Sequence, residues 1–107
     1  MNPLEISPNE AQALLDDDGT LFVDIRDAGS YASAHIRGAQ HLSHLAMDAF
    51  LAGTERSKRI VVCCYHGHSS LDAAAFLREQ GFEHAVSLTG GFEYWRQVCP
   101  DACASAT

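Results

Sequence analysis

Short apolar runs alternate with stretches of helical periodicity along this chain. Residues 21–25, 59–63 and 85–88 are mainly apolar on both faces, which is typical of strands buried within a parallel sheet. The run at 59–63 gives the clearest signal, because it is β-branched and follows four polar residues.

Helices are expected between these strands. Residues 7–10, Ser-Pro-Asn-Glu, form a capping box with proline at the first helical position, and this helix is predicted to end at residues 16–19. The strongest helical pattern is followed by Gly81, which stops a helix readily. Further helices are predicted over residues 29–35, 44–51, 70–80 and 92–98.

This alternation of strand and helix predicts an α/β fold, in which helices cover both faces of a parallel sheet. A length of 107 residues, with 47% hydrophobic and 20% charged residues, corresponds to one globular domain. We therefore expect a single domain over residues 1–107. The small, polar tail over residues 99–107 is predicted to be frayed.

The charge balance narrows the range of partners. Acidic residues outnumber basic ones by 14 to 7, and no basic stripe or cationic amphipathic helix is present, so nucleic acid and membrane surfaces are not expected partners. The sequence has neither a signal peptide nor an apolar run of the ~20 residues that span a bilayer. We expect a cytoplasmic protein with reduced cysteines.

The segment between the best strand and the best helix is the most informative one. In open α/β sheets such strand-to-helix loops bind ligands, because backbone N–H groups and the helix dipole meet there. A cysteine at this place is favoured as its thiolate. We predict Cys64 as the nucleophile, and we predict a backbone cradle for its sulfur formed by Tyr65, His66, Gly67, His68, Ser69 and Ser70.

Four motifs in this order and spacing resemble the rhodanese family over almost the whole chain. The third of them is especially similar to the active-site loop of single-domain thiosulfate sulfurtransferases of the GlpE type. The motifs are Val-Asp-Ile-Arg-Asp at 23–27, Tyr31 with His-Ile-Arg-Gly-Ala at 35–39, Cys-Tyr-His-Gly-His-Ser at 64–69, and Leu-Thr-Gly-Gly-Phe at 88–92 with Trp95.

The resemblance implies a rhodanese-like three-layer sandwich with a mostly parallel sheet of about five strands. It also implies sulfur transfer from thiosulfate, or another sulfane donor, through a persulfide on Cys64. The expected acceptors are cyanide, small thiols or a thioredoxin-like protein. Neither a metal nor a separate cofactor is expected, because the covalent persulfide is the carrier. The resemblance further suggests that Asp24 and Arg26 brace the sheet edge near the loop, although substrate binding is an alternative role for them.

This loop departs from many rhodanese loops in carrying no fixed positive charge at residues 68–72. Thiosulfate is a dianion, so the N–H groups and the helix dipole are expected to provide most of its attraction. The histidines at 66 and 68 could add charge near neutral pH, but we interpret them as rim residues whose N–H groups matter more.

The other cysteines have less specific interpretations. Cys63 should face away from Cys64, because adjacent strand residues point to opposite faces. We therefore interpret Cys63 as a core residue, with a role as redox partner as the alternative. Cys99 and Cys103 are interpreted as idle thiols, with resolution of the persulfide or a disulfide as the alternative. His35 is read as part of a turn rather than as a base, since a preformed thiolate needs none.

Three other functions compete with sulfur transfer. A phosphatase or arsenate reductase would need Cys-x5-Arg, and at the arginine position, six residues after Cys64, this chain has Ser70. A non-catalytic rhodanese-like sulfur carrier or binding module usually lacks the loop cysteine. A zinc site is disfavoured, because no Cys-x2-Cys pair exists.

Overall fold

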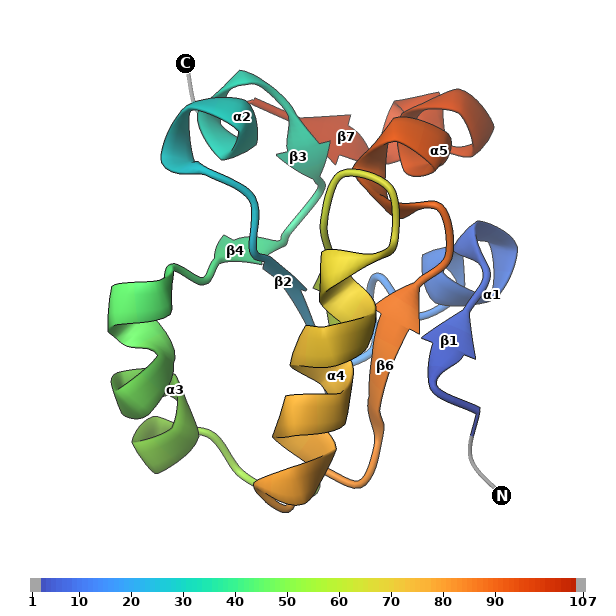
Figure 1. Ribbon diagram of the computed structural model, residues 1–107. Coiled ribbons are helices and arrows are strands. Elements are labelled where there is room, and N and C mark those ends of the chain that lie inside the picture. The colour runs from blue at the N-terminus through green and yellow to red at the C-terminus, as the bar shows by residue number, and fades with distance from the viewer. Residues whose placement is uncertain (1–2, 106–107) are drawn as a thin grey trace.

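The computed structural model describes residues 3–105 and is built around a five-stranded sheet in the order β1-β6-β5-β2-β4 (Figure 1). All of its strand pairs are parallel. These strands are β1 (Glu5–Ile6), β2 (Thr20–Asp24), β4 (Gln40–His41), β5 (Arg59–Cys63) and β6 (Ala85–Leu88). A second, antiparallel sheet pairs β3 (His35–Ile36) with β7 (Cys103–Ala104).

Helices cover both faces of the central sheet, because its strands are apolar on both sides. Val62 packs in a cluster with Leu77 of α4, whereas the next residue, Cys63, packs in the opposite cluster with Trp95 of α5. The three-layer α/β prediction is therefore confirmed. The helices are α1 (Pro8–Gln12), α2 (Ala28–Ser33), α3 (Met47–Gly53), α4 (Ser69–Glu79) and α5 (Gly91–Val98), with short 3-10 helices η1 (His44–Ala46) and η2 (Pro100–Ala102).

The first helix begins as predicted but ends earlier. The side chain of Ser7 accepts a hydrogen bond from the Glu10 backbone N–H, which completes the capping box. The prediction that the helix ends at residues 16–19 is wrong. After Gln12 the chain continues in tight turns with bonds between residues three apart, and these turns bring Leu14 and Leu15 against the core.

The tail also differs from the prediction. Residues 99–105 are ordered rather than frayed, because η2 and β7 pack back onto the domain. The carbonyl oxygen of Ala102 accepts hydrogen bonds from the Arg37 N–H at 2.8 Å and from Nε1 of Trp95 at 3.2 Å. Residues 106–107, the end of the predicted tail, lie outside the described residues. Within residues 3–105 no helix has the length and apolar character that a membrane crossing requires.

Candidate active site

The candidate site lies at the carboxyl edge of the central sheet. β5 ends at Cys63 and α4 begins at Ser69, so the predicted loop runs from the sheet into the first turn of the longest helix. Figure 1 shows this loop, in yellow, arching above α4 between α2 and α5. The sequence therefore placed the loop correctly between its strand and its helix.

The loop folds around the sulfur of Cys64. The backbone N–H groups of Gly67 and Ser70 donate to Sγ at 3.1 and 3.3 Å, and the Ser70 hydroxyl lies 3.1 Å from it. Gly67 has φ of 90°, a left-handed conformation that glycine adopts without strain. Cys64 is only 4% exposed. The two N–H donors, together with the amino end of α4, form a cradle suited to an anionic sulfur, to which the Ser70 hydroxyl can also donate.

Ser69 and Ser70 have different positions. Neither serine caps α4, since the cap residue is His68 and its side chain makes no capping bond. Ser70 is fully buried against Cys64 instead. Ser69 is exposed and lines a hollow of about 700 Å³ between α4 and η1, together with Asp72.

The remaining loop side chains are exposed: His66, His68 and Tyr65. The Tyr65 hydroxyl donates to the carboxylate of Asp27, which caps α2. The Tyr65 side chain is therefore directed to α2, and within residues 3–105 the hydrogen-bond partners of the sulfur come only from Gly67 and Ser70.

The amino end of α5 supports the loop from behind. The N–H of Phe92 donates to the Cys64 carbonyl at 2.8 Å, and the N–H of Glu93 donates to the Tyr65 carbonyl at 3.1 Å. A Cβ atom on Gly91 would lie 2.5 Å from the Tyr65 carbonyl carbon. The glycine pair at 90–91 opens α5, and the missing side chain of Gly91 permits this close approach to the loop, which the sequence did not predict.

Asp24 and Arg26 form a buried ion pair beside the loop. Nη2 of Arg26 lies 2.8 Å from the Asp24 carboxylate and donates to the Ala34 carbonyl at 2.6 Å, and its guanidinium stacks 4.4 Å from the Phe92 ring. Burial lowers the pKa of Arg26, but the hydrogen bond and charge of Asp24, together with smaller contributions from Cys63 and Glu93, leave the pKa raised. This geometry favours the bracing role over substrate binding.

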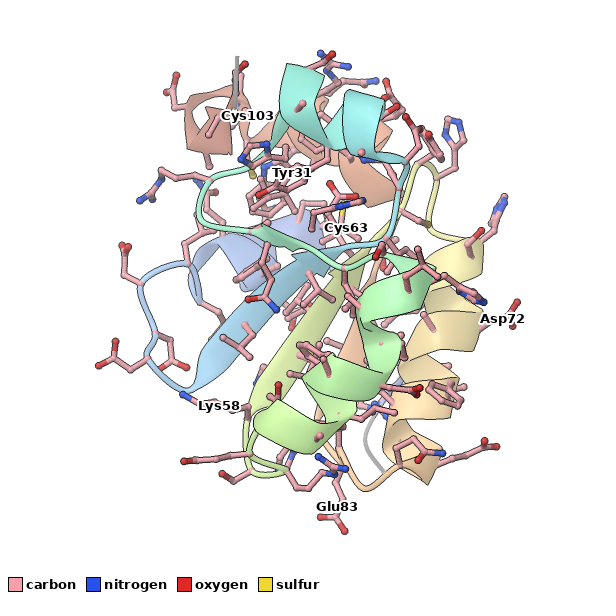
Figure 2. All side chains as sticks on the ribbon, turned by 90° about the vertical axis from the view of Figure 1, so that its left-hand side faces the viewer. Tyr31, Lys58, Cys63, Asp72, Glu83 and Cys103 are labelled. Carbon is pink, nitrogen blue, oxygen red and sulfur yellow. The ribbon has the colours of Figure 1, made fainter. Side chains whose placement is uncertain are left out.

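Cys63 points away from the cradle. It is fully buried in the core cluster on the α5 side of the sheet, and burial raises the pKa of its thiol well above the ordinary value, with Asp24 adding to the effect. Figure 2 shows Cys63 inside the fold beneath Tyr31, whereas Asp72 points outward from α4. The core interpretation of Cys63 is confirmed.

The tail cysteines and His35 lie apart from the loop contacts. Cys99 is buried, Cys103 is half-buried, and both thiols are free. Nδ1 of His35 lies 2.7 Å from the Tyr31 carbonyl oxygen, and its ring stacks on the ring of Tyr31. These contacts stabilise the turn between α2 and β3, as the interpretation of His35 as a turn residue requires. In the described part of the chain no three His, Cys, Asp or Glu side chains converge as metal ligands.

Comparisons with known proteins identify the family of this chain. Residues 7–98 match the family described as "Rhodanese-like domain". The chain is 44% identical over 102 residues to "Thiosulfate sulfurtransferase GlpE" of Pseudomonas fluorescens, covering 95% of this chain and 93% of the relative. It is 45% identical over 95 residues to the protein of the same name from Stutzerimonas stutzeri, covering 89% and 86%.

A solved structure supports the fold independently. The solution structure of the rhodanese-like domain of the Alr3790 protein from Anabaena sp. superposes with a TM-score of 0.84 at 25% identity, covering 98% of this chain and 80% of that one. Fold, motif order and relatives over nearly the whole length all agree. The chain belongs to the rhodanese family.

Proposed function

We propose that this chain is a thiosulfate sulfurtransferase that carries the transferred sulfur as a persulfide on Cys64. The observation that carries the proposal is the cradle around its Sγ, where two N–H groups and one hydroxyl converge at the amino end of α4. The names of the relatives support thiosulfate as the donor.

The first half of the reaction loads the enzyme. The Cys64 thiolate attacks the outer sulfur of thiosulfate, the sulfur–sulfur bond of the donor breaks, and sulfite leaves with the bonding electron pair. A persulfide remains on Cys64. The cradle stabilises the negative charge of the thiolate, and its backbone donors are held in place by the hydrogen bonds between the loop and α5.

The second half of the reaction unloads the enzyme. Cyanide, a small thiol or a thioredoxin-like protein attacks the outer sulfur, and the Cys64 thiolate leaves again. With a dithiol acceptor, the second thiol then releases hydrosulfide and forms a disulfide. Another sulfane donor could replace thiosulfate in the first step. Because the sulfur travels on the protein itself, the proposal needs no separate cofactor.

A cytoplasmic location is part of the proposal. All four cysteines are free thiols, and the nucleophile must stay reduced between turnovers. Phosphoryl transfer is less well supported, because the position where Cys-x5-Arg enzymes have arginine holds the buried Ser70.

Intact mass spectrometry after incubation with thiosulfate tests the proposal. We expect the protein to gain one sulfur atom and to lose it when cyanide is added, with release of thiocyanate. A protein whose mass does not change with thiosulfate, or whose added sulfur resists cyanide, would contradict the proposed reaction.

A further inference from the structure

A second buried serine stands behind the candidate site. Ser87 lies in the middle of β6, is fully buried, and is surrounded in its strand by apolar residues. Its Oγ is 2.6 Å from Oγ of Ser70, which is in turn 3.1 Å from Sγ of Cys64. A chain of three polar atoms therefore leads from β6, an interior strand of the sheet, to the sulfur of Cys64.

The hydrogen atoms in this chain can be counted. Each serine hydroxyl has one hydrogen to donate, and a buried hydrogen without an acceptor costs stability. Within residues 3–105, Ser70 is the one hydrogen-bond partner of the Ser87 hydroxyl. The Ser87 hydrogen is therefore satisfied only when it points to Ser70, and the Ser70 hydrogen is then directed to its other partner, the sulfur.

We propose that Ser87 is a positioning residue that holds the Ser70 hydroxyl as a donor toward Cys64 and thereby favours the thiolate. The opposite arrangement, in which a Cys64 thiol donates to Ser70, turns the Ser70 hydrogen toward Ser87 and leaves the Ser87 hydrogen without an acceptor. The thiolate also gains more, because donation from Ser87 polarises Ser70 and strengthens its bond to the anion.

This role rests on Cys64 as the nucleophile and matters in both half-reactions. The thiolate attacks the donor in the first step and is the leaving group in the second. Ser87 lies outside the loop, so it acts on the sulfur only through Ser70.

The rate of Cys64 alkylation by iodoacetamide, followed against pH at the peptide level, tests the proposal. We expect Ser87→Ala to move the midpoint of the rate profile upward by about half a pH unit, which slows alkylation below the midpoint about threefold. In a Ser70→Ala background, Ser87→Ala should cause no further shift, because its only route to the sulfur is gone.

A matched pair of variants separates this role from packing. Ser87→Thr and Ser87→Val introduce side chains of the same shape, but only threonine keeps a hydroxyl, so the threonine variant should have the lower midpoint. An unchanged midpoint in Ser87→Ala, an equal shift with and without Ser70, or identical threonine and valine variants would each overturn the proposal. The assay contains no thiosulfate, so a failure of sulfur transfer is detected separately by the mass measurement above.

Discussion

Cys63 and Cys64 are neighbours in the chain, but their sulfur atoms lie in opposite environments. The Cys63 side chain is fully buried in the core cluster that includes Phe92 and Trp95. Its thiol donates a weak hydrogen bond to the carbonyl oxygen of Cys64. The Cys64 sulfur lies in a loop where N–H groups of Gly67 and Ser70 point at it.

Under the proposed function, the local backbone and not burial alone distinguishes the reactive cysteine from the core cysteine. Both cysteines are less than 5% exposed, at 0% and 4%. Around Cys63 burial removes water without supplying donors aimed at the sulfur, so the neutral thiol is favoured. Around Cys64 the left-handed glycine and the start of α4 supply N–H donors in place of water.

Removing each sulfur in turn gives the largest expected contrast. Cys64→Ser should lower cyanide-dependent thiocyanate formation at least about a thousandfold, because it removes the nucleophile. Cys63→Ala should keep most of the activity, since its sulfur only fills core space. Circular dichroism serves as the control for folding. Full activity in Cys64→Ser, or loss of activity in folded Cys63→Ala, would contradict the assignment of Cys64 as the nucleophile and Cys63 as a core residue.

The ion pair beside Cys63 should matter for stability. Asp24→Asn leaves the Arg26 charge buried without its counter-ion, and we expect the free energy of unfolding to fall by about 3–5 kcal/mol. Urea denaturation measures this change. The double variant Asp24→Asn, Arg26→Met should recover part of the loss, because it removes the unpaired charge. A loss below about 1 kcal/mol in Asp24→Asn would show that the pair is not a brace.

The support behind the Cys64 loop can be tested at Gly91. A Cβ there would lie 2.5 Å from the Tyr65 carbonyl atoms, and φ is 64°, so Gly91→Ala should displace the loop and lower activity at least about tenfold. Gly53→Ala is the matched control, since nothing lies within 4 Å of its Cβ position in α3. Equal activity in the two variants would mean that α5 does not hold the cradle in place.

The raised pKa of Cys63 predicts a loss of stability in alkaline solution. The unfolded chain releases this proton near the ordinary value of 9.0, whereas the folded protein holds it to a higher pH. Above that value the unfolded state binds fewer protons, so Cys63 should lower the free energy of unfolding by about 1.4 kcal/mol per pH unit. Urea titrations of wild type and Cys63→Ala isolate this contribution, and identical pH slopes for the two proteins would refute it.

The smallest expected effect concerns the missing charge near the loop. Leu71 is half-buried in the first turn of α4, beside the exposed Asp72. Leu71→Lys should lower the KM for thiosulfate several-fold with little change in kcat, which corresponds to about 1 kcal/mol, and the gain should shrink with salt. A thermal melt checks that the variant is folded. A folded variant with an unchanged KM at low salt would show that local charge does not limit donor binding.

Much of the fold and the centre of the site could be predicted from local patterns. The strands at 59–63 and 85–88 match β5 and β6, because their signals are continuous apolar runs. The opposite orientation of Cys63 and Cys64 followed from alternation along a strand, and the loop was identified from its place between a strand and a helix.

The rest depends on contacts between distant segments. A serine inside an apolar strand carries no sign of function until β6 lies beside the loop, so Ser87 was missed. The structure of the C-terminal tail could not be predicted either, because β7 is held by pairing with β3. β3 has only two residues, too few for a hydrophobic pattern that predicts a strand. The close approach of Gly91 to the loop was missed for the same reason, although two consecutive glycines exceed what a turn requires.

The most direct test of the account is to locate the added sulfur. After loading with thiosulfate, the protein is treated with iodoacetamide and digested, and tandem mass spectrometry assigns the extra sulfur within the peptide that contains both Cys63 and Cys64. The account predicts that Cys64 carries the alkylated persulfide and that Cys63 stays unmodified until the protein is unfolded. An extra sulfur on Cys63, Cys99 or Cys103 in place of Cys64 would contradict it.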